Sequence, residues 1–504
     1  MKKLMFVVFM FVIFIFFSCS SSHSSADSDI VPDSDSDGSD TETIDDDSDS
    51  QTYEIVDDSD EVPDENSDSD TEETVPDDEE PSEPAEEIFE ETEPINGYAR
   101  CYDKIPAGDY EGLFADPNLE YWVKRSLNKD EDYELTEEDL EKVKNVQMYS
   151  KDIRGIEKLV NLKYLRISGG NVYDFSPLLK LENLKEMRID GENIDCLDGS
   201  FSLLTDLETL EIVETKLKDV SPVEQLTNLT SLMVHDNQIE FLPKNLSQLQ
   251  KLEYLAFSHN NIKSIDLVNS LIRLKELYFH YNYIEDISPI KDLINLTSLG
   301  AQDNRIKDIS AVTKLVNLTW LVLNQNQIER IPEDFVNLKK LQTCQLLYNN
   351  ISNLPNLKGL DSLVEMRISS NDLNDDDFMK FDDLESVQLL HVPLCKKITK
   401  VPIMKNLKSL KELYLNYNSI TDLSGFADNE SFPALKRLDI GSNKIDDVEA
   451  FRNRKGLSSL YVDKNCIKDF SPLEELQERG TYVGGMNEQL ESCENTTTIF
   501  KDGE

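Results

Sequence analysis

One spacing of apolar residues recurs through most of this 504-residue chain and leaves it few folds to adopt. Leucine or another apolar residue stands at the first, fourth, sixth and eleventh positions of a unit that returns mostly after 22 or 23 residues. We place the fifteen first positions at Val143, Leu162, Leu184, Leu207, Leu229, Leu252, Leu274, Leu296, Leu318, Leu341, Leu363, Leu384, Leu410, Leu435 and Leu457. So many units in one register indicate stacked structural repeats rather than separate globular domains.

Positions 3 to 7 of each unit predict one short strand, in which side chains alternate between the two faces of a sheet. Positions 4 and 6 then point inward, whereas positions 3, 5, 7 and 8 are presented on the outer face. A coil of this size buries its leucines only against its neighbours, so the core runs continuously through the array. The sequence therefore predicts an α/β solenoid of about fifteen 22-residue coils over residues 143–486, with a parallel sheet on its concave side.

Asparagine fills ten of the fifteen ninth positions, where each strand ends and the chain turns inward. These residues are Asn237, Asn260, Asn282, Asn304, Asn326, Asn349, Asn371, Asn418, Asn443 and Asn465. A buried amide can donate to and accept from backbone groups of adjacent coils that have no strand partner. We therefore interpret these asparagines as structural residues.

Two repeats are longer than the rest. Those placed at Leu384 and Leu410 run 26 and 25 residues, and the first has Val392 where asparagine is expected. We therefore expect a local bulge or kink near residues 391–409.

The ends of such an array need caps, because open strand edges pair with other chains. Residues 98–142 predict a helical N-terminal cap. Asp116-Pro117 starts one helix, with proline in the favoured first turn, and Thr136 opens a second with Asp139 three residues on. Residues 487–504 are expected to form a C-terminal tail or cap.

The cysteines differ in their expected roles. A disulfide between Cys466 and Cys493 would hold the C-terminal segment, and export from the cell permits such a bond. Cys344 falls at an inward fourth position, whereas Cys196 and Cys395 lie in turns many coils apart and cannot reach each other.

The first residues predict export. Lys2 and Lys3 precede an apolar run over residues 4–17, which is too short to span a bilayer as a helix and is typical of a signal peptide, residues 1–18. The Ser18-Cys19 junction that follows resembles the lipobox of bacterial lipoproteins, which implies lipid attachment at Cys19. The alternative is an export signal followed by an incidental cysteine. Ser20 resembles the residue that sends lipoproteins to the outer membrane, so we expect that membrane or the cell surface.

Residues 19–97 predict a disordered acidic linker. Between Ser20 and Gly97 there are 32 Asp or Glu and no Lys or Arg, with few apolar residues to bury. Much of the net charge of −50 therefore lies outside the repeats. We expect no nucleic-acid partner, because binding nucleic acid relies on basic residues that neutralise phosphates.

The outward positions of the middle repeats carry an unusual number of rings. They include His235, Tyr254, His259, Tyr278, His280, Tyr281, Trp320, Leu347 and Tyr348. The N-terminal repeats instead present charged residues such as Arg166, Arg188, Asp190 and Glu211. Aromatic side chains are enriched at the centres of protein contacts. We therefore expect the middle repeats to bind a protein ligand.

Two other functions stay open. His235, His259 and His280, with Asp236 beside them, could form a metal site for an enzyme, although we favour a polar contact surface because no ligand geometry is specified. A structural stalk without a specific ligand is the other alternative. We find no nucleophile elbow, phosphate loop or dinucleotide fingerprint, and we expect no cofactor and no catalysis.

The stretch FADPNLEYWVKRSLNKDEDYELTEEDLEKV, followed by coils such as IEDISPIKDLINLTSLGAQDN, resembles the internalin-type bacterial leucine-rich-repeat family over roughly residues 110–484. The resemblance implies a curved leucine-rich-repeat solenoid with a helical N-terminal cap, whose concave face usually binds another protein. The sequence shows neither an immunoglobulin-like region after the repeats nor a wall-anchoring signal, so the family's role in host invasion is not carried over. We expect a monomeric, membrane-anchored binding module.

Overall fold

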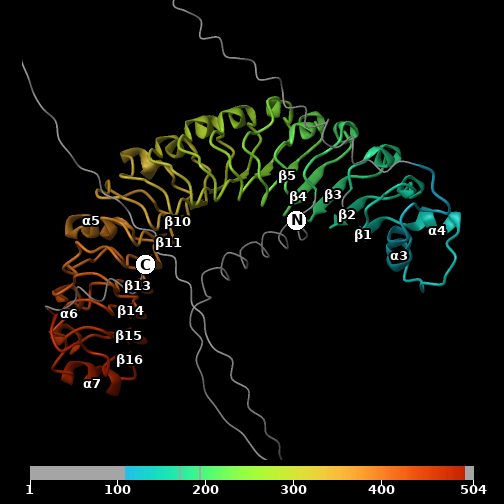
Figure 1. The fold of residues 1–504 in the computed structure, drawn as a ribbon. Coiled ribbons are helices and arrows are strands. Elements are labelled where there is room, and N and C mark those ends of the chain that lie inside the picture. The colour runs from blue at the N-terminus through green and yellow to red at the C-terminus, as the bar shows by residue number, and fades with distance from the viewer. Residues whose placement is uncertain (1–107, 170–171, 192–193, 494–504) are drawn as a thin grey trace, which may run out of the picture. The chain divides into compact units, whose positions relative to one another are not determined.

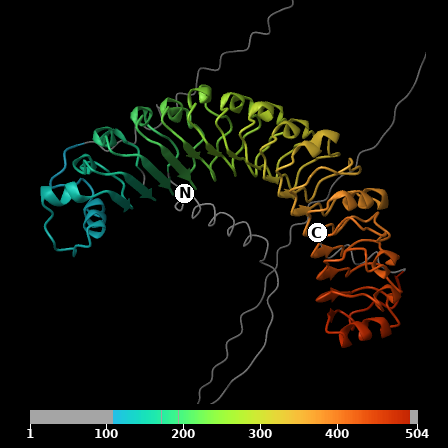
Figure 2. The same ribbon diagram turned by 180° about the vertical axis from the view of Figure 1, so that it is seen from behind.

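The structure, a computed structural model, describes residues 108–169, 172–191 and 194–493. Within these ranges sixteen strands, β1 to β16, form one parallel sheet in which every strand pairs with the next one in the sequence. The sheet lines the inner side of an arc, and short helices line the outer side (Figures 1 and 2). The predicted α/β solenoid with a concave parallel sheet is confirmed, with one strand more than the fifteen repeats.

The strands are short and evenly spaced along the chain. They are β1 (Asn145–Met148), β2 (Tyr164–Ser168), β3 (Glu186–Asp190), β4 (Thr209–Val213), β5 (Ser231–Met233), β6 (Tyr254–Ala256), β7 (Glu276–Tyr278), β8 (Ser298–Gly300), β9 (Trp320–Val322), β10 (Thr343–Gln345), β11 (Glu365–Arg367), β12 (Leu389–His391), β13 (Glu412–Tyr414), β14 (Arg437–Asp439), β15 (Ser459–Tyr461) and β16 (Tyr482–Gly484).

Helical segments return the chain to the next strand. The α-helices are α3 (Pro117–Ser126), α4 (Glu137–Lys142), α5 (Asp375–Lys380), α6 (Ser424–Ala427) and α7 (Ser471–Glu478). The 3-10 helices are η1 (Ile156–Lys158), η2 (Ser176–Lys180), η3 (Gly199–Leu203), η4 (Ser221–Gln225), η5 (Leu246–Gln248), η6 (Asp266–Ser270), η7 (Ser288–Asp292), η8 (Ser310–Lys314), η9 (Glu333–Asn337), η10 (Phe381–Asp383) and η11 (Glu449–Phe451). Among these described helices, none is long and apolar enough to cross a membrane.

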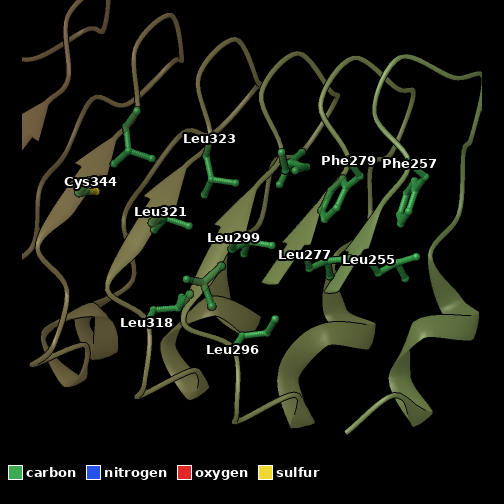
Figure 3. Close-up of a cluster of buried hydrophobic side chains, with 14 of the residues drawn as sticks. Leu255, Phe257, Leu277, Phe279, Leu296, Leu299, Leu318, Leu321, Leu323 and Cys344 are labelled. Atoms are coloured by element: carbon green, nitrogen blue, oxygen red, sulfur yellow. The ribbon is translucent and has the colours of Figure 1, made fainter. Parts of the chain in front are cut away.

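The core consists of ladders of equivalent side chains. Leu255, Leu277, Leu299 and Leu321 at position 4 are buried side by side, and Cys344 continues their row (Figure 3). At position 6, the rings of Phe257 and Phe279 stack with centroids 5.7 Å apart. Each side chain of a row is contacted mainly by its own coil and by the coils before and after it. The burial of one coil therefore depends on its neighbours.

The asparagine ladder joins the coils through their backbones. Asn304 Oδ1 accepts from the backbone N–H of Ile284 in the preceding coil at 3.0 Å. Its amide nitrogen donates to the carbonyl of Phe279 in that coil at 2.9 Å and to the carbonyl of Ala301 at 3.3 Å. The other nine asparagines are buried as well. The structural interpretation of these residues is confirmed.

The register that we assigned to the repeat at Leu384 is wrong by three residues. Leu389 in β12 pairs with Glu365 and with Glu412, the third residues of the adjacent repeats, so the unit begins at Val387. Leu384 and Val387 are both buried. The apolar spacing alone therefore does not separate the two registers.

The corrected register changes which residue ends this strand. Cys395, and not Val392, fills the ninth position of the repeat that begins at Val387. The Cys395 thiol lies 3.8 Å from the carbonyl oxygen of Ile368 in the preceding coil. A cysteine thus stands where the other coils of this region have the ladder asparagine.

The bulge or kink expected near residues 391–409 does not interrupt the sheet. Strand pairing continues from β11 through β13 without a break. The additional residues of the longer coils lie instead in the returning segments, which contain the α-helices α5 and α6.

The N-terminal cap is attached to the first coil by Asp116. One oxygen of this carboxylate accepts from the Asn118 backbone at 2.9 Å and caps helix α3. The other accepts from the Ser150 hydroxyl at 2.8 Å and from the Lys151 backbone at 3.0 Å. Thr136 and Asp139 form the predicted capping box of α4. Residues 98–107 of the predicted cap lie outside the described residues, as do the predicted signal peptide and acidic linker.

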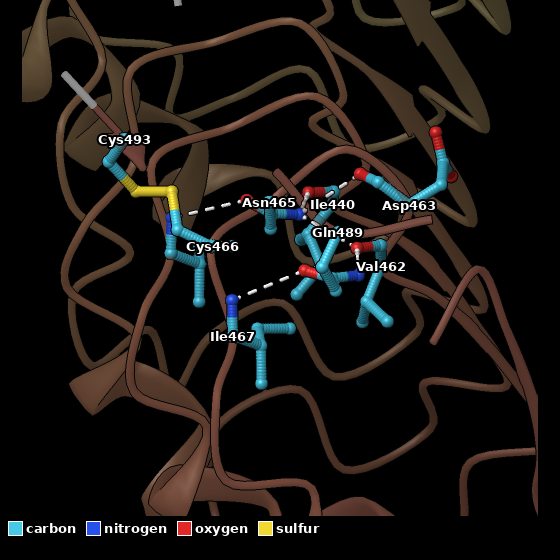
Figure 4. The surroundings of a disulfide bond; sticks show 9 residues. Ile440, Val462, Asp463, Asn465, Cys466, Ile467, Gln489 and Cys493 are labelled. Atoms are coloured by element: carbon cyan, nitrogen blue, oxygen red, sulfur yellow. Dashed lines mark hydrogen bonds between the residues drawn. A yellow bond between two sulfur atoms is a disulfide. The ribbon is translucent and has the colours of Figure 1, made fainter. Parts of the chain in front are cut away.

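At the other end, Gln489 replaces the ladder asparagine. Its side chain accepts from the Ile467 backbone at 3.2 Å and donates to the Val462 carbonyl at 2.9 Å. Cys466 and Cys493 are joined by a disulfide, with their Cα atoms 5.6 Å apart (Figure 4). Cys196 is also disulfide-bonded, whereas Cys344 and Cys395 are free and buried.

We predict that Asn304→Ala destabilises the array by about 1–3 kcal/mol, because it leaves the buried Ile284 N–H without a partner and removes the shorter of the two hydrogen bonds to the Phe279 carbonyl. Calorimetric melting of the purified chain measures this loss. Asn337→Ala is the matched control, since Asn337 has an exposed side chain at the end of η9. Equal melting temperatures for the two variants would show that the ladder does not hold the coils together.

Candidate functional site

The candidate site lies on the concave face of strands β5 to β10 and the turns that follow them. We call this surface the middle patch. It comprises the nine predicted residues His235, Tyr254, His259, Tyr278, His280, Tyr281, Trp320, Leu347 and Tyr348. The strand pairing brings them to adjacent coils, although they are buried to very different extents.

Three rings form a continuous row across the strands. Tyr254 and Tyr278 have centroids 5.5 Å apart, and Tyr278 meets Trp320 edge to face at 5.9 Å. The Tyr278 hydroxyl donates to Glu276 at 2.8 Å. Burial and the nearby Glu276 raise the pKa of both phenols far above the usual range, so the row stays neutral. It is therefore an uncharged, preformed aromatic surface on the sheet.

Gly300 makes room for this row. A Cβ atom at Gly300 would lie 2.4 Å from His280 Nε2 and 2.8 Å from a ring carbon of Tyr278, so no larger residue fits without displacing them. Tyr278 and Gly300 are direct partners in the pairing of β7 with β8. Because sequence patterns identify the outward rings but not the space between them, the role of Gly300 was not predicted.

His280 is a supporting residue of the patch and not an exposed contact. Its side chain is only 8% exposed, and its Nδ1 accepts from the Gln302 backbone at 3.0 Å. This hydrogen bond places the proton of the neutral ring on Nε2. Burial, together with the nearby His259, lowers the pKa of His280 to about 4, so the ring is uncharged at neutral pH.

The other two histidines flank Asp236. His235 Nδ1 lies 2.7 Å from one carboxylate oxygen, and His259 Nδ1 lies 3.8 Å from the other. Burial opposes ionisation of Asp236, but the hydrogen bond from His235 and the two imidazoles hold its pKa below the usual range. His280 points elsewhere, onto Gly300, so the three histidines do not converge. Among the described residues, no group of three or more His, Cys, Asp or Glu is arranged to hold a metal ion.

The most exposed rings occupy a strained backbone position. Position 8 of each coil from Glu214 to Lys464 has a left-handed backbone, with φ of 54° at His259, Tyr281 and Tyr348. Glycine, asparagine and aspartate adopt this conformation most readily, whereas a bulky residue is strained there. Backbone preference therefore does not explain the aromatic residues at position 8. Tyr348 is also 55% exposed, so core packing does not explain it either.

Polar side chains hold the exposed rings in place. Gln302 donates to the Tyr281 hydroxyl at 2.9 Å and to Gln325 at 2.9 Å, and the rings of His259 and Tyr281 stack at 4.1 Å. Gln302 was not predicted from the sequence, because a glutamine at an outward position carries no distinctive signal. Leu347 lies half-buried beside Tyr348 and completes the patch.

The N-terminal coils present a different surface. Arg166 and Arg188 pair with Asp190 at 2.7 and 2.8 Å, and Arg188 also pairs with Glu211. These charges satisfy one another across β2, β3 and β4, so this part of the concave face is a closed ion-pair network.

Comparisons with known proteins agree with the repeat assignment. The family model described as leucine-rich repeats in two copies matches residues 250–292 and 408–453. No curated protein matches the sequence.

Several solved structures share the fold. An internalin from Listeria monocytogenes is 25% identical with a TM-score of 0.54, covering 74% of this chain and 95% of its own. A leucine-rich-repeat protein of Leptospira interrogans is 23% identical with a TM-score of 0.58, covering 69% and 97%. The functional domain of InlJ from Listeria monocytogenes is 21% identical with a TM-score of 0.61, covering 73% and 79%. The chain thus has the leucine-rich-repeat fold, and its structural neighbours include bacterial proteins of internalin type, in agreement with the resemblance seen in the sequence.

Proposed function

We propose that this chain is a binding protein whose middle patch forms the centre of contact with a protein ligand. Leucine-rich-repeat solenoids commonly serve as protein-binding modules. The observation that carries the proposal here is the placing of exposed rings at strained positions, as at Tyr281 and Tyr348. Neither local backbone preference nor burial in the core accounts for them.

The physical properties of the patch suit a protein contact. Tyrosine and tryptophan provide large contact areas while losing few rotatable bonds, and they dominate the energetics of many interfaces. The row from Tyr254 to Trp320 is held in place by packing before any ligand binds. The paired charges around Arg188 would lie at the rim, where ion pairs contribute little net affinity.

We predict that a photoreactive p-benzoylphenylalanine in place of Tyr348 crosslinks to a protein on intact cells or their neighbours. The same group in place of Phe241 is the matched control, because Phe241 is 79% exposed and lies outside the strands. Adducts are read by mass on denaturing gels. If only position 241 gave adducts, the ligand would contact a surface other than the concave face, and the proposal would be contradicted.

Once the ligand is identified, Trp320→Ala and Tyr348→Ala should each weaken binding about tenfold or more, or at least about 1.4 kcal/mol. Phe241→Ala should bind as the unaltered chain does. Titration calorimetry measures the affinities, and melting temperatures confirm that the variants are folded. Normal binding by both aromatic variants would contradict the proposal.

We also propose that the chain is exported and held to a membrane through a lipid on Cys19. The support is the sequence of a basic start, a short apolar run and the Ser18-Cys19 junction. The acidic stretch up to Gly97, whose like charges repel and extend it, would then carry the solenoid away from that membrane.

We predict that Cys19→Ser releases the protein from membranes, because the variant lacks the thiol to which the lipid would be attached. Cell fractionation and incorporation of labelled palmitate measure the change. Ser22→Ala, three residues on, is the control and should remain membrane-bound. A Cys19→Ser variant that still fractionates with membranes and incorporates label would disprove the anchor.

A further inference from the structure

A second group of rings lies on the concave face of β12 to β16, beyond the middle patch. We call it the arginine–tyrosine patch, and it comprises His391, Tyr414, Arg437, Tyr461 and Tyr482. His391 and Tyr414 have centroids 5.3 Å apart, and Tyr461 and Tyr482 have centroids 5.8 Å apart. Arg437 and the three tyrosines were not predicted as site residues from the sequence.

Arg437 lies between the two halves of this patch. Its guanidinium carbon is 5.5 Å from the ring centroid of Tyr414 in the preceding strand and 4.8 Å from that of Tyr461 in the following strand. Two ring faces therefore hold the cation on the sheet surface. Its Nε is shielded from solvent and has no hydrogen-bond partner among the described residues.

Other arginines on the concave strands are neutralised by a carboxylate. Arg166 and Arg188 pair with Asp190, and Arg367 pairs with Glu365 on its own strand. Arg437 makes no such ion pair within the described part of the chain. This is unexpected in a protein with 100 acidic and 50 basic residues.

Nearby carboxylates are engaged with other donors. Glu412, the strand partner of Arg437, accepts from the Tyr414 hydroxyl at 2.8 Å. Asp439, two residues beyond Arg437, accepts from the Gly441 backbone at 3.1 Å. Neither carboxylate forms an ion pair with Arg437 in the described part of the chain, so its terminal nitrogens remain able to donate to a carboxylate from outside the chain.

We propose that Arg437 binds one carboxylate from an extended segment of a partner protein, with Tyr414, Tyr461 and Tyr482 packing against the apolar residues that flank it. A planar guanidinium held edge-on can form two parallel hydrogen bonds with a carboxylate. Tyr482 is 61% exposed and would lie at the open side of this contact.

The surrounding charges restrict the ligand to a single negative charge. Glu412, Asp439 and Asp463 lie on the same three coils. Burial and the charge of Asp463 raise the pKa of the Asp439 carboxyl, although its hydrogen bond from Gly441 and the charge of Arg437 act in the opposite direction. A phosphate, a sulfated chain or a run of acidic residues would be repelled by these groups. A single Asp or Glu among neutral residues can pair with Arg437 with the least electrostatic repulsion from these groups.

This site is independent of the middle patch. Five strand spacings separate β9, which contains Trp320, from β14, or roughly 24 Å at about 4.8 Å per strand. The two surfaces can therefore be inactivated separately, and failure of one proposal leaves the other intact.

The test uses random dodecapeptides displayed on phage and selected on the purified full chain. Peptides retained by the unaltered chain but lost on Arg437→Ala should contain one Asp or Glu flanked by apolar or aromatic residues. Replacing that acid by Asn or Gln in the synthetic peptide should weaken binding tenfold or more. Arg166→Ala, which removes a paired arginine twelve strands away, and Trp320→Ala should leave the binding unchanged.

Arg437→Lys keeps the charge and the aliphatic stem, and so tests the geometry even if Arg437→Ala folds poorly. Weaker binding by Arg437→Lys supports the paired hydrogen bonds, and equal binding contradicts them. Selection of peptides without an acid, or of none that depend on Arg437, overturns the proposal. Competition by inorganic phosphate or glucuronate as strong as that by the peptide would show a general anion or sugar-acid site instead.

Discussion

The buried asparagine amide at the end of each strand is the interaction on which the rest of the structure depends. It satisfies backbone groups of two coils at once, as Asn304 does for Ile284 and Ala301, where the chain leaves the sheet and has no strand partner. It fixes the position at which the strand ends, and the residue before it takes the left-handed backbone. Because of this repeated turn, residues at the position before the asparagine, such as Tyr281 and Tyr348, have exposed side chains.

The same interaction explains why the array tolerates one unusual coil. Cys395 replaces asparagine and brings its thiol to the Ile368 carbonyl, but a thiol is a weak donor. Asn418 in the next coil still donates to the Val392 carbonyl at 2.9 Å and accepts from the Cys395 backbone at 2.7 Å. Because each asparagine serves two coils, its neighbour preserves the connection across this coil. The sheet therefore stays continuous there.

The sequence predicts the features that follow from the periodicity of the repeats. It does not predict those that depend on how side chains of adjacent coils pack against one another. The inward rows, the asparagine ladder and the cap helices follow from spacing and capping residues. The register at Val387 does not, because apolar residues three positions apart fit the pattern equally well and only strand pairing separates them. His280 was expected to be exposed. The alternation of side chains along a strand predicts the face on which a residue lies, but not its rotamer, and the rotamer of His280 places the ring over Gly300. Arg437 could not be recognised from the sequence, because its lack of an ion pair is apparent only when the side chains of three adjacent strands are seen together.

Both concave patches use one arrangement of residues to display rings on a narrow sheet. Tyr278 and Gly300 are partners across β7 and β8, and Tyr461 and Gly484 are partners across β15 and β16. A Cβ at Gly484 would lie 3.1 Å from a ring carbon of Tyr461, just as one at Gly300 would meet Tyr278. In each case the absent side chain leaves space for the tyrosine ring to lie along the sheet towards the next coil. Glycine weakens a strand, so its presence here reflects the packing of the rings rather than the stability of the strand. The residues at inward positions determine the fold of each coil. The residues at outward positions that pair across adjacent coils determine what the concave surface can bind.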